Sequence, residues 1–106
     1  MKNPVRIFKP SGILDTDKGN NLRQEVINTL SEETNIFLID LADVSFMNSS
    51  GLGSLVATYK SVKTANKNLF LCGLNDQVRI IFELTKMDLI FTIFKDVQDF
   101  EKQQFS

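Results

Sequence analysis

The chain has 106 residues, 42% hydrophobic and 24% charged, a composition typical of one globular domain rather than a disordered segment. Twelve basic residues oppose thirteen acidic ones, and the formal net charge of −1 argues against a nucleic-acid partner. The longest uninterrupted apolar run, residues 36–39, is far shorter than the roughly 20 residues needed to span a bilayer, so no membrane segment is predicted.

The single cysteine, Cys72, has no partner for an internal disulfide, and no apolar segment follows Lys2 and Arg6 as in a secretion signal. These features favour a reducing, cytoplasmic setting. No internal repeat or linker divides the chain, so residues 1–106 are expected to form a single domain.

The N-terminal third predicts two short strands and a helix. Residues 5–8 partly alternate as in an edge strand, Ser11 and Gly12 form a turn, and residues 13–14 add a second strand, which together predict a β-hairpin. A helix capped by Thr16 or Asp17 follows. Its apolar face is made by Leu22, Val26 and Leu30.

The remainder alternates between strands and helices. Strands are predicted at residues 36–41, 69–72 and 89–94, and helices at residues 52–63, after Asn75 and from Asp96 onward. This order predicts an α/β fold with a mixed, mostly parallel sheet of four to five strands and about four helices. Function in such sheets gathers at strand-to-helix loops.

Residues 46–53, Phe-Met-Asn-Ser-Ser-Gly-Leu-Gly, stand at one of these loops and are the most informative segment. The simplest interpretation is a helix cap, because Asn and Ser are preferred caps and glycine eases the turn. A second is a phosphorylation or anion site, because the N-terminus of a helix favours negative charge. Met47 could present an exposed, flexible side chain to a partner, or could pack beneath the loop.

Catalysis and cofactor binding have little support. The chain has no histidine, so neither serine of this loop has the usual activating base, and no catalytic residue is predicted. Gly51 and Gly53 begin a dinucleotide fingerprint, but Val56 stands where its third glycine belongs. Without histidines or paired cysteines, neither a metal site nor another cofactor is expected, and Cys72 is interpreted as a small buried apolar residue.

Residues 43–53, Asp-Val-Ser-Phe-Met-Asn-Ser-Ser-Gly-Leu-Gly, resemble the signature of STAS domains, specifically of the bacterial anti-sigma factor antagonists. Residues 12–15, Gly-Ile-Leu-Asp, are similar to the family's second recurrent segment. The resemblance covers essentially the whole chain and implies a STAS fold. It also implies a protein-binding switch that captures a serine-kinase anti-sigma factor, is turned off by phosphorylation and is restored by a serine phosphatase.

Carried onto this chain, the resemblance makes Ser49 the phosphorylated residue, with Ser50 as second choice, and places Asp15 close to Ser49. The expected partner-binding residues are Asp15, Met47, Asn48, Ser49, Ser50, Gly51 and Leu52.

Asn48 departs from the family, which usually has aspartate before the phosphorylated serine. Asparagine retains the cap but lacks the charge. This difference keeps open a non-phosphorylated STAS scaffold or accessory subunit. A small-molecule or nucleotide sensor using the helix N-terminus remains an alternative of another class. The sequence does not specify an oligomeric state.

Overall fold

The computed structural model describes residues 4–105, so residues 1–3 and 106 of the expected domain lie outside it. Its main sheet has four strands in the order β1-β3-β5-β6, formed by β1 (Val5–Phe8), β3 (Ile36–Asp40), β5 (Asn68–Cys72) and β6 (Ile93–Phe94). A second, two-stranded sheet pairs β2 (Gly12–Leu14) with β4 (Val44–Met47). Every ladder in the described residues is parallel, which confirms the predicted α/β class.

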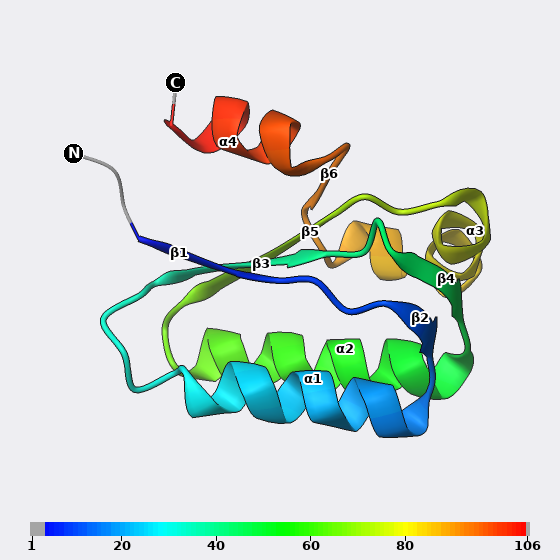
Figure 1. The fold of residues 1–106 in the computed structure, drawn as a ribbon, viewed down its shortest axis with the longest axis horizontal. Helices are drawn as coiled ribbons and strands as arrows, with labels where there is room; N and C mark the ends of the chain where they lie inside the picture. The colour runs from blue at the N-terminus through cyan, green and yellow to red at the C-terminus, as the bar shows by residue number, and fades with distance from the viewer. Residues whose placement is uncertain (1–3, 106) are drawn as a thin grey trace.

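Helices cover both faces of the main sheet (Figure 1). The helices α1 (Thr16–Asn28) and α2 (Ser49–Thr64) lie side by side on one face, and α4 (Val97–Phe105) lies on the other, next to β6. Between them, β3 is buried along its whole length, as the uninterrupted apolar run predicted. The short helix α3 (Asp76–Leu84) packs against β4.

The N-terminal strands form where expected but do not pair with each other. β1 pairs with β3, and β2 continues in the same direction to pair with β4 (Figure 1). Residues 9–11 therefore carry the chain from one sheet to the other instead of reversing it, and the Gly12 N–H donates to the Asp43 carbonyl. Pro10 has no N–H for a ladder, which removes one bond that a hairpin would need. The predicted hairpin is thus replaced by two parallel pairings.

The strand predicted at residues 89–94 is much shorter in the structure. The left-handed conformation of Lys86, with φ of 64°, ends α3 and starts a 3-10 turn, η1 (Met87–Leu89). Leu89 is 79% exposed and only Ile93–Phe94 join the sheet. The apolar composition of this segment therefore reflects side chains left at the surface, such as Leu89 and Ile90, as well as the burial of Phe91, which lies outside the strand.

Candidate functional site

Two helix N-termini meet at the carboxyl ends of β2 and β4. Leu14 pairs with Met47 in the ladder, so the next residues, Asp15 and Asn48, follow in parallel, and the Asn48 N–H donates to the Leu14 carbonyl at 3.4 Å. Each caps its own helix. The structure therefore brings together the two segments that the sequence singled out, residues 12–15 and 43–53, which lie on the right of Figure 1.

The caps differ in charge but share their geometry. An Asp15 carboxylate oxygen accepts from the Lys18 N–H at 3.1 Å, and the Asn48 side-chain oxygen accepts from the Gly51 N–H at 2.8 Å. Asp15, rather than the predicted Thr16 or Asp17, is thus the cap of α1. Asn48 forms the cap that its position in the sequence predicted.

Ser49 and Ser50 are the first two residues of α2, and both are exposed. Among the hydrogen bonds of residues 4–105, neither hydroxyl takes part in one. The backbone N–H groups of these positions have no partner within a helix, so the site combines free hydroxyls with the positive end of the helix dipole. A phosphate on either serine would be electrostatically favoured there.

Three of the expected partner-binding residues are buried. Met47 has no exposed surface, Leu52 is 5% exposed, and Gly51 is buried as well. In the free chain the side chains of Met47 and Leu52 point into the core and Gly51 has none, although Met47 still borders the groove described below, so the partner-binding role expected of these residues stays a prediction. They support the loop from beneath.

A register shift in the small sheet explains the burial of Met47. Gly12 pairs with Val44 but Ile13 pairs with Phe46, which leaves Ser45 as an extra residue in β4. Side chains of a regular strand alternate between its two faces, so with Val44 buried, Phe46 would point inward and Met47 outward. The extra residue reverses the direction of both side chains. Met47 therefore enters the core and Phe46 is 46% exposed.

The amide side chain of Gln77, on α3, holds the other edge of β4. It accepts from the Met47 N–H at 2.9 Å and donates to the Met47 carbonyl at 3.0 Å, as a neighbouring strand would. Asn75 caps α3 as predicted, through the Val78 N–H, and also donates to the Val44 carbonyl at 2.9 Å. Gln77 is not recognisable from the sequence, because no residue near it in the chain indicates that β4 lies beside α3.

A shallow apolar groove of about 380 Å³ runs between the end of β4 and α3. Phe46 and Ser49 lie on one wall, with Ile80 and Leu84, which are 53% and 79% exposed, on the other. Ile13, the ladder partner of Phe46, is 54% exposed and extends the apolar surface. The groove was missed in the sequence, although adjacent apolar pairs such as Ile80 and Ile81 indicate that one member must face outward.

Other chemistry is sparse in the described part of the chain. It contains no cluster of three or more metal-ligating side chains. Cys72 is fully buried, which confirms the prediction of a small buried residue, and burial, reinforced by the nearby Asp40 carboxylate, raises the pKa of its thiol to about 12. None of the described helices has the length and apolarity required to cross a membrane.

Comparison with known proteins agrees with the geometry. The STAS domain family model matches residues 2–100. An anti-sigma-B factor antagonist of Staphylococcus epidermidis is 32% identical over 77 residues, which cover 73% of this chain and 71% of the relative.

Solved structures share the fold. A putative anti-sigma factor antagonist from Thermotoga maritima superimposes with a TM-score of 0.85 at 23% identity, covering 96% of this chain and 88% of that one. The Bacillus cell fate determinant SpoIIAA in its phosphorylated form has a TM-score of 0.71 at 14% identity, covering 96% and 93%. With the family model spanning nearly all of its length and both recurrent segments joined at one site, this chain belongs to the STAS domain family.

Proposed function

We propose that this protein is an anti-sigma factor antagonist, a binding switch rather than an enzyme. It would capture a serine-kinase anti-sigma factor, lose it on phosphorylation of Ser49 and regain it through a serine phosphatase. The observation that carries this proposal is the position of Ser49, an exposed hydroxyl at the start of α2 that also forms one wall of the apolar groove. The names of the relatives support it, and one fold relative is a phosphorylated protein.

The groove supplies the surface that a partner needs. Ile13, Phe46, Ile80 and Leu84 are apolar and each is between 46% and 79% exposed. Contiguous exposed apolar surface is typical of an interaction site. The three buried residues of the loop then serve to present Asn48, Ser49 and Ser50 at its edge.

Phosphorylation would act on binding rather than on folding. A phosphoserine adds about −1.5 to −2 charges, which the N-terminus of α2 accommodates. The neutral Asn48 adds no like charge there, although Asp15 stands on the neighbouring strand end. In a docked complex the same charge would lie beside apolar groups, where an unpaired buried charge costs several kcal/mol of binding free energy. Because about 1.4 kcal/mol corresponds to a tenfold change in affinity, this cost would weaken binding substantially.

Ser49 is preferred to Ser50 because Ser49 lines the groove and Ser50 does not. The test compares alanine variants of Ser49 and Ser50, after a pull-down from native lysate has identified the partner. Ser49→Ala should retain partner binding and abolish phosphorylation by that kinase, whereas Ser50→Ala should retain both. Phosphate found by mass spectrometry on Ser50 alone would show that the assignment is wrong.

A charge-mimicking pair tests the switch itself. Ser49→Glu should weaken partner binding at least tenfold, a loss of about 1.4 kcal/mol, with an unchanged circular dichroism spectrum. Ser50→Glu should weaken it less. Equal binding by wild type and Ser49→Glu would instead favour the non-phosphorylated scaffold, as would stable co-purification with a large complex.

A further inference from the structure

The side-chain amide of Gln77 has one N–H that makes no hydrogen bond among residues 4–105. A primary amide carries two N–H donors, and the first of them donates to the Met47 carbonyl at 3.0 Å. The amide oxygen accepts from the Met47 N–H at 2.9 Å. Because the amide is planar and its nitrogen faces the Met47 carbonyl, the second N–H points onward along the chain, toward Asn48 and Ser49.

Gln77 and Ser49 lie on opposite walls of the apolar groove, called here the Ser49 groove. Ser49 belongs to the wall at the start of α2, whereas Gln77, Ile80 and Leu84 belong to the wall formed by α3. None of the residues that line this groove carries a charge. The side-chain amides of Asn48 and Gln77 are its N–H donors, and Asn48 lies on the same wall as Ser49. A bond from Gln77 to a group on Ser49 would therefore join the two walls.

Electrostatics would direct a phosphate on Ser49 toward Gln77. Asp15 stands at the end of β2, on one side of β4, and Gln77 holds the other edge of β4. A phosphoserine carries about −1.5 to −2 charges, so the Asp15 carboxylate repels it and the Gln77 N–H attracts it. Asp76, next to Gln77 in the chain, is 95% exposed and paired with Arg79 at 3.2 Å. A hydrogen bond to a charged acceptor is roughly twice as strong as one between neutral groups.

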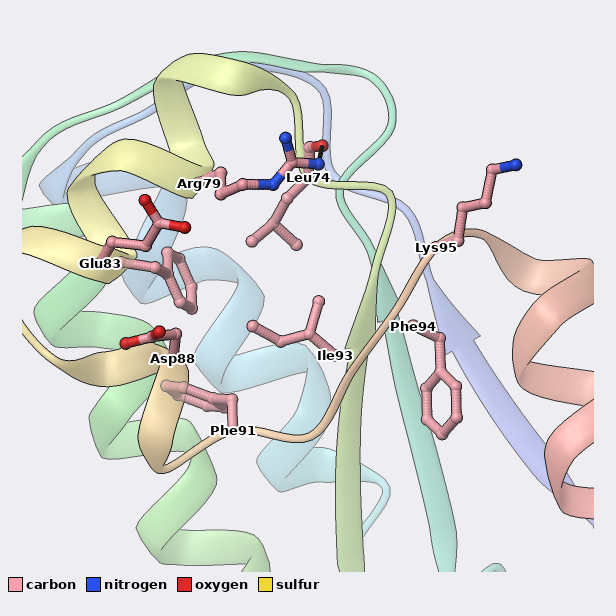
Figure 2. A pocket seen from close by; sticks show the side chains of 9 residues that line it. Leu74, Arg79, Glu83, Asp88, Phe91, Ile93, Phe94 and Lys95 are labelled. Carbon is pink, nitrogen blue, oxygen red and sulfur yellow. Dashed lines mark hydrogen bonds between the residues drawn. The ribbon is translucent and has the colours of Figure 1, made fainter.

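A cavity borders the face of α3 that points away from the Ser49 groove. Residues three or four apart share a helix face, so Gln77, Ile80 and Leu84 face the groove while Arg79 and Phe82 face the opposite side. On that side a cavity of about 550 Å³ opens between α3, η1 and β6, and Figure 2 shows Arg79 at its edge. A small movement of α3 toward the start of α2 would therefore break few packing contacts behind it.

We propose that Gln77 receives the phosphate of Ser49 within the chain. Its second amide N–H donates to a phosphate oxygen, and this bridge joins the two walls of the Ser49 groove and narrows the groove against an apolar partner. Phosphorylation then closes the docking surface as well as charging it. The proposal rests on the phosphorylation of Ser49 proposed above, and it concerns what the phosphate contacts in the free chain.

The test uses full-length protein synthesised with phosphoserine at position 49, so that no kinase is needed. We expect the side-chain N–H resonances of Gln77 to shift downfield in NMR spectra, and the bridging N–H to exchange with solvent about tenfold more slowly than in unmodified protein. Protein with phosphoserine at position 50, which does not line the groove, is the matched control and should show neither change. A Gln77 amide with the same signals in both phosphorylated proteins would overturn the proposal.

A variant separates the effect of the bridge on partner binding from the effect of the charge. Gln77→Met retains an unbranched side chain of similar length but has no N–H donor. Phosphorylation of Ser49 should weaken partner binding at least tenfold in wild type but only about threefold in Gln77→Met. Because each phosphorylated protein is compared with its own unmodified form, a general weakening by the substitution cancels. Gln98→Met, an exposed control on α4, should respond as wild type does.

The outcomes distinguish this proposal from the switch on which it rests. Equal losses of affinity in wild type and Gln77→Met would overturn the bridge and leave the switch at Ser49 intact. No loss in either protein would overturn the switch, and the NMR comparison would still decide whether the bridge forms.

Discussion

At the scale of single residues, Gly51 is required for close packing rather than for a flexible turn. A Cβ atom on Gly51 would lie 2.8 Å from the Leu14 carbonyl carbon and closer still to its oxygen. The first turn of α2 therefore rests directly on the end of β2. This contact joins the two segments that form the candidate site.

Gly53, two residues later, provides a matched control, since a Cβ there would meet nothing within 4 Å. We predict that Gly51→Ala lowers the free energy of unfolding by about 2–3 kcal/mol, because the backbone of β2 cannot move aside cheaply. Gly53→Ala should raise it by about 0.5–1 kcal/mol, the usual gain in a helix. Urea denaturation of both variants measures the difference, and similar effects at the two positions would contradict this account.

At the scale of elements, α3 forms one wall of the Ser49 groove. It carries Ile80 and Leu84 into this groove, while Phe82 anchors the helix in the core. The position of α3 depends on the paired hydrogen bonds between Gln77 and Met47. Together with the bond from Asn75 to the Val44 carbonyl, these bonds hold α3 against β4 and so maintain the groove beside Ser49.

Replacing Gln77 by Glu tests this attachment. The carboxylate can still accept from the Met47 N–H but cannot donate to the Met47 carbonyl, so an unsatisfied, partly buried carbonyl remains. We expect Gln77→Glu to lower the free energy of unfolding by about 1–3 kcal/mol and to weaken partner binding. Gln98→Glu, an exposed control on α4, should change the stability by less than about 0.5 kcal/mol. Equal stabilities of the two variants in urea would contradict the role of Gln77.

At the scale of the whole molecule, two apolar clusters flank the main sheet. The larger lies under α1 and α2, and a smaller one beneath α4 contains Cys72 and Phe100, where the rings of Phe70, Phe94 and Phe100 contact one another. Cys72 is a titratable probe of that smaller cluster, because its thiol is fully buried there.

The raised pKa of Cys72 predicts a loss of stability in alkali. The ordinary pKa of 9.0 applies to the unfolded chain and about 12 to the folded one, so the unfolded state loses its proton first as pH rises. Below pH 9 the thiol is neutral in both states and makes no pH-dependent contribution. Between about pH 9 and 12 its contribution falls by up to about 1.4 kcal/mol per pH unit.

The variant Cys72→Ala isolates this effect from the titration of lysine and tyrosine side chains. The stability advantage of wild type over the variant should be constant from pH 7 to about 8.5 and shrink above it. Denaturation curves at each pH measure this difference. If the two proteins lose stability in parallel, the thiol is not buried in the folded state.

Local pattern was sufficient to predict most of the elements and part of the site. The continuous apolar run of β3 indicated a strand covered on both faces, and Asn48 and Asn75 were recognisable as caps. The strand and both caps are recognisable because each depends on residues that are close together in the chain. The two recurrent segments, at residues 12–15 and 43–53, were sufficient to identify the family.

The tertiary structure decided which of these residues reach the surface. The extra residue in β4 buries Met47 and exposes Phe46, Gln77 holds β4 from 30 residues away, and Leu89 stays outside the sheet. These outcomes depend on pairing partners far apart in sequence, which local pattern does not specify. By itself, the sequence determined most of the elements, the family and the candidate serine. The strand β4 and the groove beside that serine were decided by pairing and packing in the folded chain.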